Sequence, residues 1–142
     1  MRNKARITAL ILMSVFFSGC ATAPAVHILD LSENQLKLRS VQTRAFDTSD
    51  REKMLRSVMA TLQDLDFVIH KADFELGIVS AAKFIQYQVV KITVIVRSKG
   101  DNQLLVRANA QHGINAVTDP KEYQHFFDAL SKAVFLTAQN ID

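Results

Sequence analysis

The side chain with the most distinctive reactive chemistry is the thiol of Cys20, the only cysteine in the 142-residue chain. Within the chain it has no partner for a disulfide, so in an exported protein the thiol needs another explanation. The small residues Ser18 and Gly19 come directly before it, at the end of an apolar run from Ile7 to Phe17. This arrangement indicates a processing site at which the sulfur is covalently modified.

The apolar run itself is too short to cross a membrane, because a spanning helix needs about 20 apolar residues. Arg2, Lys4 and Arg6 precede it. A basic start, an apolar centre and small residues before a cut are typical of a secretory signal peptide. We therefore expect residues 1–19 to be removed, which would place the rest of the chain outside the cytoplasm.

The sequence Phe17-Ser18-Gly19-Cys20 resembles the lipobox of bacterial lipoproteins, although Phe17 stands where Leu, Val or Ile is usual. The resemblance implies that signal peptidase II recognises Phe17, Ser18 and Gly19 and that Cys20 then carries acyl chains such as palmitate. Several chains together anchor a protein stably. Since Ala21 rather than aspartate follows the cysteine, the resemblance implies the periplasmic face of the outer membrane. The alternative is an ordinary signal peptide with a cysteine at the cut by chance.

Other reactive side chains do not form a recognisable motif. The histidines are isolated in the sequence, without the spacing of a metal site: His27, His70, His112 and His125. Asp64 and Asp66 lie in a connector, where carboxylates are usually solvated. The chain has no GxSxG and no glycine-rich phosphate loop. We predict no metal, no cofactor and no enzymatic activity, although dispersed residues can still assemble a triad.

The charge balance argues against a nucleic-acid partner. The chain has 17 basic and 14 acidic residues, which suggests a basic protein. However, the whole excess comes from Arg2, Lys4 and Arg6, and residues 1–19 contain no acid. The expected mature chain is formally neutral, so we predict no nucleic-acid binding.

The remaining chain is long enough for one domain. We expect residues 20–37 to be the acylated cysteine and a tether, and residues 38–142 to be a single domain. The segment "VHILDL" at 26–31 could instead pair with a sheet or rest against the body, so the boundary is soft.

The hydrophobic pattern predicts an α+β fold of about five antiparallel strands with two helices packed on one face, in the order β-α-β-β-β-β-α. Alternation predicts strands at 39–46, 67–72, 78–85, 88–97 and 104–112. The first helix follows Ser49 as N-cap, with Glu52 completing a capping box. The second follows Asp119 as N-cap, with Pro120 at its first position. Gly77 and Gly100 mark turns.

Two helices leave the other face of such a sheet open. Alternation predicts that this face is basic and apolar, with Arg44, Lys83, Lys91, Arg97 and Arg107 as its candidate partner-binding residues. Also assigned to it are Phe46, Val79, Ile85, Val89, Ile95, Leu105, Asn109 and Gln111. The simple interpretation is a solvated face on which Lys and Arg stems lie. The sharper hypothesis is a surface that docks on an anionic partner.

The run from Val41 to Lys83 resembles the helix-then-hairpin modules of small bacterial lipoproteins. Similar modules occur in the helix-grip domains of a lipoprotein subunit of the outer-membrane barrel-assembly machinery. The likeness includes the junction Asp64-Leu65-Asp66-Phe67, in which Asp66 stands where glycine is commoner. It is a likeness of fold and implies no site residues.

Three functions therefore remain open. The first is a lipid-anchored, non-enzymatic accessory or scaffold subunit of an envelope complex for transport, efflux, secretion or assembly, with a protein partner. The second is a module that binds lipid or peptidoglycan, which should show a concave apolar pocket with convergent polar groups. The third, an envelope hydrolase, has no support in the sequence. The sequence does not indicate an oligomeric state.

Overall fold

A computed structural model describes the backbone of residues 26–139 and the side chains of residues 33–136. The expected signal peptide, lipobox and Cys20 lie outside the described residues. Contacts divide the chain into two units, residues 1–31 and 32–142. The elements are α2 (Val26–Val41), β1 (Thr43–Phe46), α3 (Arg51–Asp64), β2 (Val68–Asp73), β3 (Ile78–Ile85), β4 (Gln88–Lys99), β5 (Gln103–His112), β6 (Asn115–Ala116) and α4 (Pro120–Gln139).

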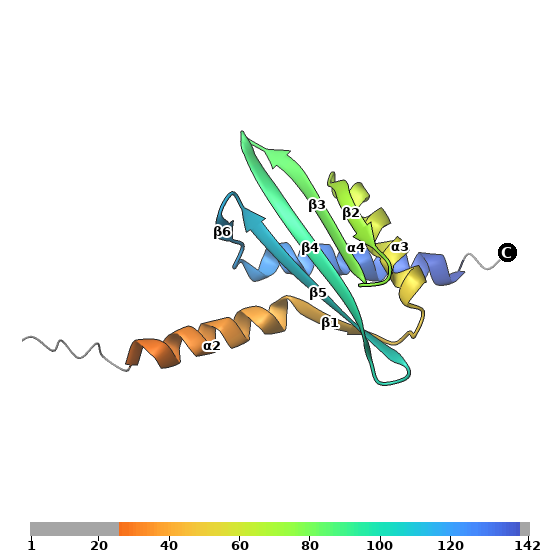
Figure 1. The fold of residues 1–142 in the computed structure, drawn as a ribbon, viewed down its shortest axis with the longest axis horizontal. Coiled ribbons are helices and arrows are strands. Elements are labelled where there is room, and N and C mark those ends of the chain that lie inside the picture. The colour runs from red at the N-terminus through yellow and green to blue at the C-terminus, as the bar shows by residue number, and fades with distance from the viewer. Residues whose placement is uncertain (1–25, 140–142) are drawn as a thin grey trace, which may run out of the picture. The chain divides into compact units, whose positions relative to one another are not determined.

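The strands form one antiparallel sheet in the order β1-β5-β4-β3-β2, and the short β6 pairs with β5. Figure 1 shows α3 and α4 side by side across one face of this sheet. The predicted α+β class, with an antiparallel sheet and two helices packed on it, is confirmed. The order along the chain differs, because a helix precedes the first strand and β6 follows β5.

The core lies between the two helices and the sheet. Alternate residues of the central strands point toward the helices and are buried: Val79, Ala81, Ile92, Val94, Val96, Leu104, Val106 and Ala108. The apolar stripes predicted for the helices meet them there, with Met54, Leu55, Val58 and Leu62 from α3 and Tyr123, Phe126, Phe127 and Leu130 from α4. Including the half-buried residues, this core extends only from Leu38 to Val134, so the unit that begins at Ser32 contains all of it.

The start of α4 is as predicted, and the start of α3 differs by one residue. The Asp119 carboxylate accepts a hydrogen bond from the Lys121 backbone N–H (2.9 Å), and Pro120 opens the helix. For α3, Asp50 rather than Ser49 is the N-cap, and its carboxylate accepts from the Lys53 N–H (2.9 Å). Asp50 lies three residues before that N–H, which is the reach that capping requires.

The segment expected to be a tether is helical from Val26, and α2 continues through Val41. Low periodicity suggested a linker, but periodicity reports which face is buried and not whether a helix forms. Glu33 and Lys37 form an ion pair one turn apart (2.7 Å), and residues 26–41 contain no Gly or Pro that would interrupt a helix. Only Leu38 and Val41, near its end, pack against the core.

The first strand is correspondingly shorter than predicted, since residues 39–41 belong to α2 and β1 covers only Thr43–Phe46. The predicted turns are confirmed at Gly77 (φ 70°) and Gly100 (φ 64°). Between β3 and β4 the chain turns on Gln86 (φ 45°) and Tyr87 (φ 68°). Neither of these two residues in the left-handed conformation is a glycine, so the sequence lacks the usual signal for this turn.

Candidate functional site

The open face of the sheet holds three of the five predicted cationic residues. Buried Ile92, Val94 and Val96 face the helices, so Lys91 and Arg97 alternate with them on the other side. Arg107 lies opposite Ile95 on the same side. None of the three cations forms a salt bridge with a residue of the described region. We call Lys91, Arg97 and Arg107 the basic open face.

Arg44 does not belong to this face, and its predicted position was wrong. It lies opposite the buried Val106 and therefore faces the helices. Its guanidinium contacts α4, with hydrogen bonds to Asp128 Oδ1 (3.4 Å) and Gln124 Oε1 (3.2 Å). It also lies 4.9 Å from the centre of the Phe127 ring. Arg44 thus holds α4 against the edge strand.

Lys83 was also assigned to the wrong face. It pairs with Val90, which is on the helix side, as Val79 pairs with the buried Val94. The same correction applies to Val79, which was also expected on the open face but is buried under the helices. It applies as well to Phe46, which pairs with the buried Leu104, and to Ile85, which lies two residues after Lys83 and therefore on the same side of β3. The residue pattern within a strand shows which side chains share a face, but the pairing register decides which face that is.

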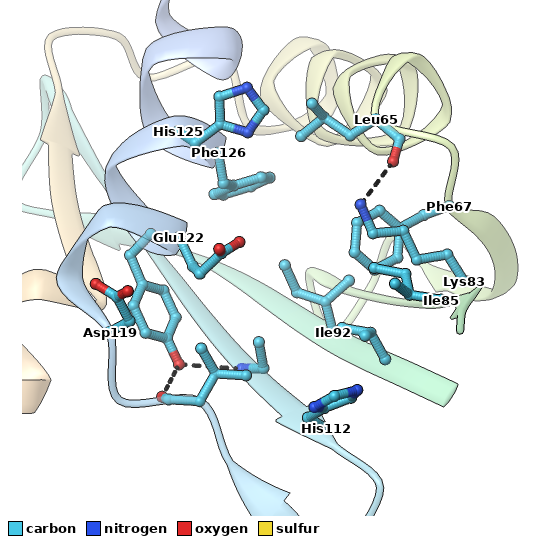
Figure 2. A pocket seen from close by; sticks show the side chains of 14 residues that line it. Leu65, Phe67, Lys83, Ile85, Ile92, His112, Asp119, Glu122, His125 and Phe126 are labelled. Carbon is cyan, nitrogen blue, oxygen red and sulfur yellow. Dashed lines mark hydrogen bonds between the residues drawn. The ribbon is translucent and has the colours of Figure 1, made fainter. Parts of the chain in front are cut away.

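On the helix side, Lys83 lines a cavity of about 330 Å³ at one end of the core. The cavity lies where α3 ends and α4 begins, over the ends of β3, β4 and β5 (Figure 2). Its apolar wall consists of Leu65, Phe67, Ile85, Val90, Ile92, Ala110, Val117 and Phe126. Its polar residues are Lys83, His112, Asp119, Glu122, Tyr123 and His125.

The ammonium group of Lys83 is held at the end of α3. It donates a hydrogen bond to the carbonyl oxygen of Leu65, the C-cap residue (3.2 Å). It also lies 4.5 Å from the centre of the Phe67 ring. Helix ends favour a cation at their free carbonyls, and an aromatic face adds a cation–π attraction.

The turn that presents Phe67 is a Schellman motif. The Phe67 N–H donates to Leu62 O (2.9 Å), and the Asp66 N–H donates to Gln63 O (3.0 Å). Asp66 has a φ of 64°, the left-handed conformation that this motif requires and that glycine adopts at least cost. This is the junction position at which glycine is commoner.

The acidic residues of the cavity come from the start of α4. Asp119 caps the helix, and Glu122 lies in its first turn. The positive end of a helix stabilises a carboxylate there. In Figure 2 Lys83 and Phe67 lie on one side of the cavity, and Glu122 and Asp119 come from the other. The cavity therefore offers charges of both signs around an apolar wall.

Two histidines that are isolated in the sequence, His112 and His125, both line this cavity. They lie on different sides of it in Figure 2. Among the described residues, no group of three or more His, Cys, Asp or Glu side chains is placed to hold a metal ion. The sequence did not reveal these cavity residues as a group, because they come from the ends of several elements and share no motif.

Comparison with known proteins does not assign the chain to a family. A scan against protein-family models found no match, and a search of curated proteins found no similar sequence. None of the helices within residues 26–139 is both long and apolar enough to span a bilayer.

Proposed function

We propose that this protein is a non-enzymatic binding module of the bacterial cell envelope, anchored through acylated Cys20, whose cavity takes a small ligand with an apolar body. This is the second of the three functions that the sequence left open. The observation that carries it is the apolar cavity of about 330 Å³, which charged side chains enter from strand β3 and from the start of α4. Such concave, mostly apolar sites with a few placed polar groups are typical of small-molecule binding.

The size of the cavity limits what it can hold. Pockets for small molecules span about 300 to 1,000 Å³, and this one is at the lower end. It suits one short chain or one small building block of an envelope polymer. A whole polymer strand would have to lie outside it.

Cavity binding is tested by adding a neutral apolar probe, 1-octanol, to the fragment Ser32–Asp142. This fragment contains the entire core. Backbone amide NMR shifts are expected to cluster at the cavity, for example at Ile92 and Phe126. Ala110→Leu should fill the cavity and abolish these shifts. Ala45→Leu makes the same change at an exposed position on the open face and should leave them intact. Shifts spread evenly over the surface, or unaffected by Ala110→Leu, would contradict the proposal.

The anchor is tested separately on protein from its native host. Mass spectrometry of the intact product is expected to show a chain that begins at Cys20 and carries acyl groups. Cys20→Ser should release the protein from the membrane fraction. A retained leader or an unmodified thiol would disprove the anchor and the proposed location at the periplasmic face of the outer membrane, while leaving the cavity proposal standing.

A second candidate, the scaffold subunit of an envelope complex, is favoured by the basic open face, whose three cations have no ion-pair partner among the described residues. We expect reversal of Lys91, Arg97 and Arg107 to Glu to abolish co-purification with a membrane complex. The matched control reverses three exposed cations on helices, Arg39, Lys121 and Lys132. If both triple variants behave alike, the face has no specific role.

A further inference from the structure

We propose that the ligand of the cavity is a zwitterion, an apolar amino acid or short peptide whose ammonium group meets Glu122 and whose carboxylate meets Lys83. This inference rests on the proposed function and adds the chemical class of the ligand. It is carried by two oppositely charged side chains that enter one apolar cavity from different elements, β3 and α4.

The carboxylate of Glu122 is free to receive a cation. Within the described region it forms neither a hydrogen bond nor a salt bridge. It comes from the first turn of α4 and points into the cavity in Figure 2. The neighbouring acid, Asp119, is occupied in capping the helix. Glu122 is therefore the acid of the cavity that can accept an ammonium group.

The ammonium group of Lys83 is free to receive an anion. Its polar contact is the neutral carbonyl of Leu65 at 3.2 Å, and no carboxylate among the described residues pairs with it. An ammonium group has three donors, so a ligand carboxylate can bind without breaking the bond to Leu65. Lys83 is half-buried, where a charge-assisted hydrogen bond is stronger than in bulk water.

Helix ends stabilise both charges. Lys83 lies at the carbonyl end of α3, and Glu122 lies at the N–H end of α4. Neither side chain has to reach the other across the apolar wall, so the two charges remain available at separate points. A ligand with charges of both signs satisfies each, whereas a fatty acid or an alkylamine would cover one of them without pairing it.

The test uses three water-soluble probes with the same apolar body: leucyl-leucine, which is zwitterionic; N-acetyl-leucyl-leucine, which is only anionic; and leucyl-leucine amide, which is only cationic. Binding to the mature lipidated protein in nanodiscs is measured by calorimetry. The zwitterion is expected to bind about tenfold more tightly than either of the others, since each lost charge-assisted hydrogen bond costs about that factor.

Variants then assign each charge to its side chain. Lys83→Gln should weaken the binding of the zwitterion and of the anionic probe and leave the affinity for the cationic probe unchanged. Glu122→Gln should weaken the binding of the zwitterion and of the cationic probe and leave the affinity for the anionic probe unchanged. Lys91→Gln, the same change on the open face, should alter none of the three affinities.

Equal affinity for the three probes, or tighter binding of a singly charged probe, would overturn the inference. These comparisons on the unmodified protein need no variant, so a folding defect in Lys83→Gln would not obscure them. If 1-octanol enters the cavity and leucyl-leucine does not bind, the zwitterion inference fails and the proposed function stands. If neither probe enters the cavity, both fail.

Discussion

The side-chain amide of Gln42 donates a hydrogen bond to the phenolic oxygen of Tyr123 (3.1 Å), and both residues are buried. The same oxygen donates to the carbonyl of Val117 (2.8 Å) and accepts from the N–H of Ala110 (3.3 Å). One hydroxyl therefore joins the turn before β1, strand β5 and the loop before α4. It also secures the side of the cavity from which Asp119 and Glu122 come.

Removing this hydroxyl should be costly. Tyr123→Phe leaves three polar groups without this partner, the buried Gln42 amide and the part-buried Ala110 N–H and Val117 carbonyl, so we expect the free energy of unfolding to fall by about 2–3 kcal/mol. Urea unfolding followed by circular dichroism measures the loss. Tyr87→Phe is the control, because Tyr87 is fully exposed and should have no effect. A loss below about 0.5 kcal/mol in Tyr123→Phe would show that water replaces the hydroxyl.

The two turn glycines should respond differently to alanine. At Gly77, a Cβ would lie 2.5 Å from the carbonyl oxygen of Val96, whereas at Gly100 it would meet nothing. Both have positive φ, which costs an alanine about 1–2 kcal/mol. We expect Gly100→Ala to lose about that much and Gly77→Ala to lose at least about 3 kcal/mol, because the clash adds to the strain. Equal losses in thermal or urea unfolding would contradict this difference.

Replacing Asp66 by glycine should stabilise the protein. It lies at the left-handed position of the Schellman motif that ends α3, with a φ of 64°. Asp66→Gly is expected to raise the free energy of unfolding by about 0.5–1 kcal/mol, and Asp66→Ala to lower it by a similar amount. Both variants remove the carboxylate, so the difference between them isolates the backbone effect. Urea unfolding measures the three stabilities. Equal stability of the two variants would contradict the backbone effect, and an unmodified protein more stable than Asp66→Gly would show that the carboxylate itself stabilises the junction.

The turn between β3 and β4 should also be stabilised by residues that adopt positive φ more readily. Gln86 and Tyr87 both have positive φ, as in the tight hairpin turns that prefer Asn-Gly. Replacing the pair by Asn-Gly is expected to stabilise the protein by about 1 kcal/mol, since both side chains are exposed and no packing is lost. Thermal unfolding measures the gain. A lower melting temperature would contradict this expectation.

The sequence alone was sufficient to predict α3, α4 and the central strands. In α3, for example, Met54, Leu55, Val58 and Leu62 recur at helical spacing and are all buried. Alternation in β4 likewise predicted that Ile92, Val94 and Val96 point inward. These patterns are local, and burying their apolar faces is the main driving force for folding. Helix α2 was missed because the part of it with described side chains buries little beyond Leu38 and Val41.

Only the tertiary structure decided which face each strand presents and which distant residues meet. Arg44 and Lys83 turned inward because the register places them beside Val106 and Val90, and a one-residue shift in pairing would have reversed both. The cavity brings together the end of α3, the start of α4 and the ends of three strands. Periodicity in the sequence specifies what each element buries, but only packing brings the Lys83 ammonium and the Glu122 carboxylate into one cavity.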